Sequence, residues 1–130
     1  MRYLFLKIII FCVFIVFILY FVSKNISNNK IDDSLYLGVF LDEDVNEPNL
    51  IISKNEDGTY SIELGIFRLA SFEDRKGKLT KDGMEFKAID PSGKEIKGII
   101  IVNNKVATVK FTDSTWRYIK NGDEFKYHRN

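Results

Sequence analysis

The stretch that decides the fold is GMEFKAIDPSGKEIKGIIIVNNKVATVKF, residues 83–111. Apolar side chains recur at every second position in three of its segments, and a period of two is that of a β-strand with one buried face. The alternating apolar positions are Met84, Phe86 and Ala88, then Ile96 and Ile100, then Ala107, Val109 and Phe111. Turn-forming residues separate the segments, at Asp90-Pro91-Ser92-Gly93 and at Asn103-Asn104. The stretch therefore predicts three antiparallel strands joined by short turns.

The same pattern continues on both sides of this stretch. Residues 60–66 alternate in the same way, and a shift of phase from Ile66 to Phe67 beside Gly65 predicts a β-bulge. Further strands are expected at residues 35–41, 50–53, 75–79 and 124–128, while residues 114–120 are expected to form a loop or a single helical turn. The sequence thus predicts an all-β domain, an antiparallel meander of about eight strands that can close into a barrel.

One hairpin is expected to be apolar on both of its faces. A two-residue turn at Asn103-Asn104 pairs Ile101 with Val106, and alternation then places Ile99 on the same outer face. Either the segment 114–120 covers this outer patch, or a partner does. The candidate partner or ligand surface consists of Ile99, Ile101, Val106, Trp116 and Tyr118.

The N-terminus is a different kind of sequence. Residues 4–22 are apolar except for Lys7, and as a helix they would span about 28 Å, close to the hydrocarbon thickness of a bilayer. The expected organisation is a transmembrane signal-anchor helix over residues 1–23, a polar linker over 24–33 and an extracytoplasmic β-barrel domain over 34–130. A signal sequence cleaved after Ser23, giving a secreted protein, stays open as the alternative, although Phe21 is bulky for a cleavage site.

Charge and cysteine content exclude some functions. Residues 31–130 hold 15 Lys and Arg against 18 Asp and Glu, so nothing predicts binding to nucleic acid. Six of the acidic residues precede residue 48, which leaves the rest of the domain mildly basic. The single cysteine, Cys12, lies in the apolar segment, so no disulfide within the chain is expected.

No motif in the sequence assigns a catalytic, cofactor-binding or metal-binding residue. Residues 42–46 start like a calcium loop, but Glu47 and Ser53 stand where an EF-hand needs Gly and Glu. The single histidine, His128, has no second His or exported Cys with which to form a zinc site. The aromatic cluster from Trp116 to Tyr127 is expected either to close one end of the barrel or to bind a partner.

Four short motifs resemble small exported bacterial lipocalin-like β-barrel domains. They are Gly38-x-Phe40, Leu50-x-Ile52, Asp57-Gly58-x-Tyr60-x-Ile62 and Trp116-x-Tyr118-x(3)-Gly122-x(2)-Phe125-x-Tyr127. The resemblance covers most of residues 35–130 and implies a small barrel that binds apolar ligands or proteins, including lysozyme in the case of inhibitors. The disulfide common in those inhibitors is missing here, and the resemblance assigns no functional residue.

The expected function is a binding or interaction module, anchored in the membrane through residues 4–22, rather than an enzyme. Two other classes stay open: an inhibitor or immunity protein that protects the envelope from a hydrolase or toxin, and an envelope hydrolase. An enclosed apolar cavity would favour a small ligand. A filled barrel with an exposed acidic or aromatic loop would favour a protein partner, and convergent titratable groups in a cleft would favour an enzyme.

Overall fold

The structure is a computed structural model that describes residues 1–27 and 31–130, without the side chains of residues 25–27 and 74. The predicted linker, residues 24–33, thus lies partly outside the described residues. Two compact units are present, Met1–Ile31 and Asp32–Asn130. The first is the helix α1, Arg2–Ser27, whose large apolar side chains from Tyr3 to Val22 are exposed. It is long and apolar enough to cross a membrane, a property that anchors and signal sequences share.

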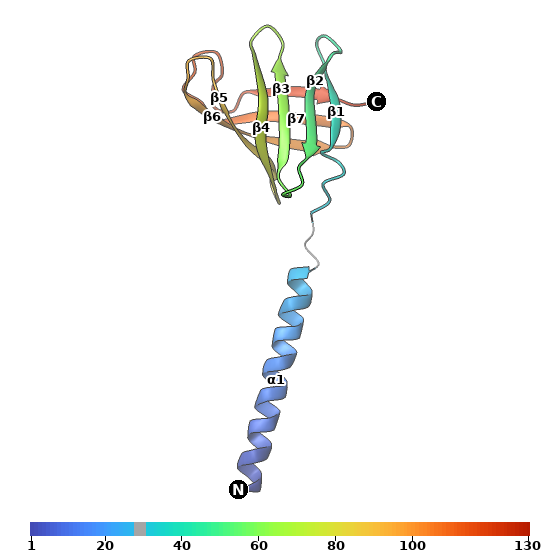
Figure 1. The fold of residues 1–130 in the computed structure, drawn as a ribbon, viewed down its shortest axis with the longest axis vertical. Coiled ribbons are helices and arrows are strands. Elements are labelled where there is room, and N and C mark those ends of the chain that lie inside the picture. Colours follow the sequence, from blue (N-terminus) through green and yellow to red (C-terminus); the bar gives the residue numbers. More distant parts are fainter. Residues whose placement is uncertain (28–30) are drawn as a thin grey trace. The chain divides into compact units, whose positions relative to one another are not determined.

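The second unit is a closed barrel of eight antiparallel strands in sequence order, which confirms the predicted fold class (Figure 1). The strands are β1 Gly38–Asp42, β2 Pro48–Lys54, β3 Tyr60–Ile66, β4 Ala70–Thr80, β5 Gly83–Ile89, β6 Glu95–Asn103, β7 Val106–Asp113 and β8 Glu124–His128. Each strand pairs with the next one along the chain. The barrel closes where β1 pairs with β8, through Leu41↔His128 and Asp42↔Tyr127.

Apolar side chains fill the interior of the barrel. They come from alternate positions of all eight strands, as the period of two requires, together with Ile119 from the loop between β7 and β8. The buried set is Phe40, Leu50, Ile52, Tyr60, Ile62, Leu64, Ile66, Phe72, Met84, Phe86, Ala88, Ile96, Ile100, Val102, Ala107, Val109, Phe111, Ile119 and Tyr127. Fully burying one of the larger side chains contributes about 1.5–3 kcal/mol, so this set is the main source of stability.

Two glycines beside Phe86 make room for side chains inside the barrel, Gly98 for the Phe86 ring and Gly77 for Ile62 and Met84. Gly77 and Gly98 are the cross-strand partners of Phe86 on its two sides. A Cβ atom on Gly98 would lie 2.5 Å from Cζ of Phe86, and one on Gly77 would lie 2.7 Å from Cδ1 of Ile62. The Phe86 ring also packs edge-on against Phe111, with ring centroids 5.9 Å apart. A side chain at Gly98 would therefore overlap the Phe86 ring, and one at Gly77 would overlap Ile62 and Met84.

The register of the β6–β7 hairpin differs from the prediction. Asn103 pairs with Val106 and Ile101 with Thr108, so the two turn residues are Asn104 and Lys105. Asn104 takes the left-handed conformation at φ 57°, which asparagine tolerates better than most residues. From Gly98 to Val102, each β6 residue thus pairs with a β7 residue two positions further along the chain than predicted. Because residues two apart lie on the same face of a strand, the predicted assignment of residues to the two faces is unchanged.

The predicted bulge beside Gly65 is wrong. Strand β3 ends at Ile66, and the change of phase there is a tight turn in which Arg68 has φ 58° and the Leu69 amide donates to the Ile66 carbonyl at 2.9 Å. The irregularity in the β3–β4 ladder lies further back, between Ile62 and Leu64. A turn and a bulge both shift the apolar phase by one residue, so periodicity alone does not separate them.

The segment before β1 is tied across one end of the barrel. The Asp33 carboxylate accepts hydrogen bonds from Nζ of Lys54 at 2.7 Å and from the Tyr60 hydroxyl at 2.8 Å. The Arg129 guanidinium donates to the carbonyls of Leu37, at 3.0 Å, and Leu35. These contacts hold the start of the second unit against β2, β3 and the end of the chain.

The packing around Phe86 predicts a specific pair of stability effects. Gly98→Ala should lower the free energy of unfolding by about 1–3 kcal/mol, because the new methyl group overlaps the Phe86 ring. Phe86→Leu removes the atoms Cε1 and Cζ, so the double variant should lose less than the two single variants together. Urea denaturation of the full chain in uncharged detergent micelles measures this. Additive losses would contradict the proposed overlap.

The Asp33 contacts predict a pH effect. The hydrogen bonds from Lys54, and then from Tyr60, hold the pKa of Asp33 below its ordinary value of 3.8. A depressed carboxyl pKa contributes stability above the ordinary pKa and loses it as the pH falls through the folded-state pKa. The melting temperature of Asp33→Asn should therefore lie below that of the unsubstituted chain at pH 7, and the difference should shrink as the pH falls below the ordinary pKa of 3.8. Glu43→Gln, which removes an exposed carboxylate, is the control, and a constant difference would refute the role of Asp33.

Candidate functional site

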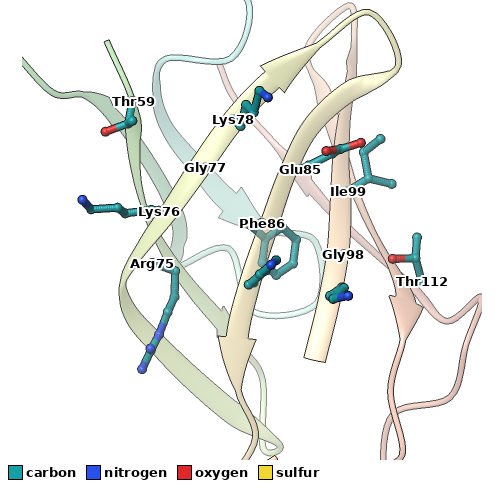
Figure 2. A pocket seen from close by; sticks show the side chains of 12 residues that line it. Thr59, Arg75, Lys76, Gly77, Lys78, Glu85, Phe86, Gly98, Ile99 and Thr112 are labelled. Carbon is teal, nitrogen blue, oxygen red and sulfur yellow. The ribbon is translucent and has the colours of Figure 1, made fainter. Parts of the chain in front are cut away.

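The described residues form an open groove of about 800 Å³ on the outside of the barrel, across β4, β5 and β6 (Figure 2). Most of its lining side chains alternate with buried residues along their strands, so they point outward. The lining residues are Thr59, Arg75, Lys76, Gly77, Lys78, Glu85, Phe86, Lys87, Lys97, Gly98, Ile99 and Thr112. The candidate site is therefore an outer surface rather than the barrel interior.

The groove is basic. Five of its lining side chains carry positive charge, against the single carboxylate of Glu85, which lies opposite Lys78 across the β4–β5 ladder. Lys87 lies directly opposite Lys97, and like charges in such a pair repel each other. Two acidic residues lie beside Lys97: its Nζ is 4.0 Å from Oε1 of Glu95, and its direct partner across the β6–β7 ladder is Asp113. An anionic group in the groove would relieve the repulsion between the two lysines.

The β4–β5 ladder opens at the groove. Its pairs run from Thr80↔Gly83 to Gly77↔Phe86, and Figure 2 shows the two strands moving apart beyond Phe86. Before Gly77, the described pairing of β4 is with β3. Arg75 pairs with the buried Ile62 and so belongs to the inward phase of β4, yet it lines the groove. The groove on the outer face thus extends to the gap where β4 and β5 no longer pair.

The structure brings together only part of the predicted partner surface. Ile99, Ile101 and Val106 lie on the outer face of the β6–β7 hairpin, where Ile101 is 43 % exposed and the other two are half-buried. Ile99 also lines the groove. The apolar patch on the hairpin is therefore a continuation of the basic groove.

Trp116 and Tyr118 lie elsewhere. Both belong to the loop between β7 and β8, at the end of β7 opposite to the β6–β7 turn. Trp116 packs against the core, and its ring contacts that of Tyr118 at a centroid distance of 5.1 Å. Tyr118 is 52 % exposed. Trp116 thus helps to close one end of the barrel, and the exposed Ile101 is not covered by this loop.

The other motifs of the sequence have structural explanations. In the β1–β2 loop, Oδ1 of Asp42 accepts a hydrogen bond from the Asp44 amide at 2.7 Å, and Asn46 is left-handed at φ 55°, so the acidic residues form a turn. His128 is half-buried on the outer face of β8. Within the described residues, no three His, Cys, Asp or Glu side chains gather as a metal site would need.

The basic groove was missed in the sequence analysis. A signal was present, because lysines occupy the outward phase of three neighbouring segments, at residues 76 and 78, at 87 and at 97. Alternation alone says that these lysines are solvent-exposed. It does not say that strands curve or separate so that the lysines surround one hollow.

No protein-family model matches this chain, and neither a curated protein nor a solved structure matches it. The fold is therefore assigned from the strand pairing, and the candidate site from its geometry.

Proposed function

We propose that this protein is a binding module, anchored in a membrane by α1, whose barrel lies outside the cytoplasm and holds a partner in the basic groove. The observation that carries the proposal is the contrast between the two sides of the barrel wall. The inner side is occupied by the protein's own apolar side chains. The outer side has a groove of about 800 Å³ with paired lysines.

The filled interior favours a macromolecular partner over a small apolar ligand. Lipocalin-type binding of a small molecule needs an enclosed apolar space, typically about 300 Å³ or more. The largest fully buried side chains here, among them Tyr127, Phe40 and Phe111, occupy that space instead. The lipocalin-like resemblance is thus proposed for the architecture and not for the mode of binding.

An inhibitor or immunity protein of the cell envelope is the second candidate. The β1–β2 loop exposes the acidic side chains of Glu43, Asp44 and Glu47, and Tyr118 is exposed at the same end of the barrel. An exposed acidic and aromatic loop over a filled barrel favours contact with another protein. In this candidate the loop end, rather than the groove, contacts the hydrolase or toxin.

The anchoring half of the proposal predicts how the protein fractionates. The protein should pellet with membranes, resist extraction with alkaline carbonate and keep its N-terminal residues, because α1 has the length and composition of a spanning helix. Protease added to intact cells should reach the barrel. Mature protein that starts near Lys24 would show a cleaved signal sequence and contradict the anchor.

The groove predicts opposite effects of one substitution on stability and binding. Lys87→Glu places opposite charges across the β5–β6 ladder, where such a pair contributes about 0.2–1 kcal/mol, so the melting temperature should rise slightly. Cross-linked partner recovered from the native envelope should fall at least tenfold. Lys126→Glu, on the outer face of β8, is the matched control. Capture that depends on Glu43 and Tyr118 but not on Lys87 would favour the inhibitor candidate.

A further inference from the structure

The geometry of the groove points to the chemistry of its occupant: an acidic stretch of extended polypeptide that pairs with the free edge of β4 and directs its carboxylates at Lys76, Lys87 and Lys97. This inference rests on the proposed function, because it assigns an occupant to the same groove. Three observations support it: a free strand edge, the continuity of that edge with the groove, and the charges around both.

The first observation is the unpaired strand edge. In the described ladders, residues 70–76 of β4 pair with β3, and residues 87–89 of β5 pair with β6, but the two segments do not pair with each other. Two backbone edges therefore border the opening that begins at Gly77↔Phe86. An unpaired edge presents N–H and C=O groups that an added strand can satisfy.

The second observation is that the edge and the groove are continuous. Arg75 and Lys76 belong to the part of β4 that no longer pairs with β5. They line the groove together with Lys87, which belongs to the part of β5 that no longer pairs with β4. Figure 2 shows Phe86 on β5, beside the place where the two strands separate. A chain bound along the edge would thus lie in the groove, and its side chains would face the basic residues.

The third observation is the charge. Alternate side chains of an extended peptide lie on one face, about 6.8 Å apart, and neighbouring strands are about 4.8 Å apart. Carboxylates at alternate positions can therefore meet Lys76 on one side and Lys87 or Lys97 on the other. The exposed Glu73 limits the acidic stretch to the part of the edge beside Arg75 and Lys76.

A polypeptide fits these observations better than a lipid surface or a phosphate polymer. All three could supply negative charge to the lysines. Only a polypeptide supplies amides and carbonyls at the spacing of a strand edge. A bilayer surface, moreover, is flat, whereas the lysines line a hollow.

The test uses the full chain in uncharged detergent micelles and the blocked peptide Glu-Thr-Glu-Thr-Glu with a fluorescent label. The peptide should bind, and Lys87→Glu should weaken binding at least tenfold while Lys126→Glu leaves it unchanged. Raising NaCl from about 0.05 to 0.5 M should also weaken it, because salt screens the contacts. The same peptide methylated on its threonine amides should bind at least tenfold more weakly. Bound peptide should slow hydrogen exchange of the amides in residues 70–76.

The outcomes separate this inference from the function on which it rests. Equal binding of the methylated peptide, without slower exchange in residues 70–76, would overturn strand pairing and leave a groove that binds anions by charge alone. Binding of polyphosphate or of phosphatidylglycerol vesicles, but not of the peptide, would overturn the polypeptide occupant. If Lys87→Glu also left the amount of cross-linked envelope partner unchanged, the proposal that the groove binds the partner would be refuted.

Discussion

The packing of Phe86 between Gly77 and Gly98 connects the two sides of the barrel wall. On the inside, Gly98 leaves space for the ring, which packs edge-on against Phe111, and Gly77 leaves space for Ile62 and Met84. On the outside, the same row is the point beyond which β4 and β5 stop pairing, and all three residues line the groove. A larger side chain at Gly98 would disturb the core, while the opening of the ladder at Gly77 gives access to the strand edge. Stability and the candidate function therefore depend on one cross-strand row.

A filled interior has consequences for where the protein can act. Small barrels either enclose a ligand or pack their own side chains, and here the chain does the second. The candidate site therefore lies on the outer surface, where water solvates the charged side chains. Lys87 and Lys97 lie directly opposite each other, and like charges in such a pair are destabilising, although Asp113 lies opposite Lys97 on its other side. An anionic partner that bound the folded state there would stabilise it.

Both ends of the barrel are closed by segments outside the strands. At one end, the β7–β8 loop inserts Ile119 into the core, and the Tyr127 hydroxyl donates to the Gly65 carbonyl at 2.7 Å. Burial raises the pKa of Tyr127, so that hydroxyl stays protonated as a donor. At the other end, Asp33 and Arg129 hold the segment before β1. The strands of the meander need such closures because short ladders alone leave the core open to water.

Periodicity was enough to determine the class of fold. The alternation in residues 83–111 predicted three strands and their buried faces, and the turn at Asp90-Pro91-Ser92-Gly93 forms as expected, with Gly93 at φ 88° and Oδ1 of Asp90 accepting from the Ser92 amide. Local sequence determines these features because side-chain direction and turn conformation depend on neighbouring residues. The groove, the hairpin register and the separation of Trp116 from Ile101 were decided only by the tertiary structure. They depend on how strands far apart in sequence curve, pair and separate. The sequence of one strand does not determine where its pairing with a neighbouring strand ends.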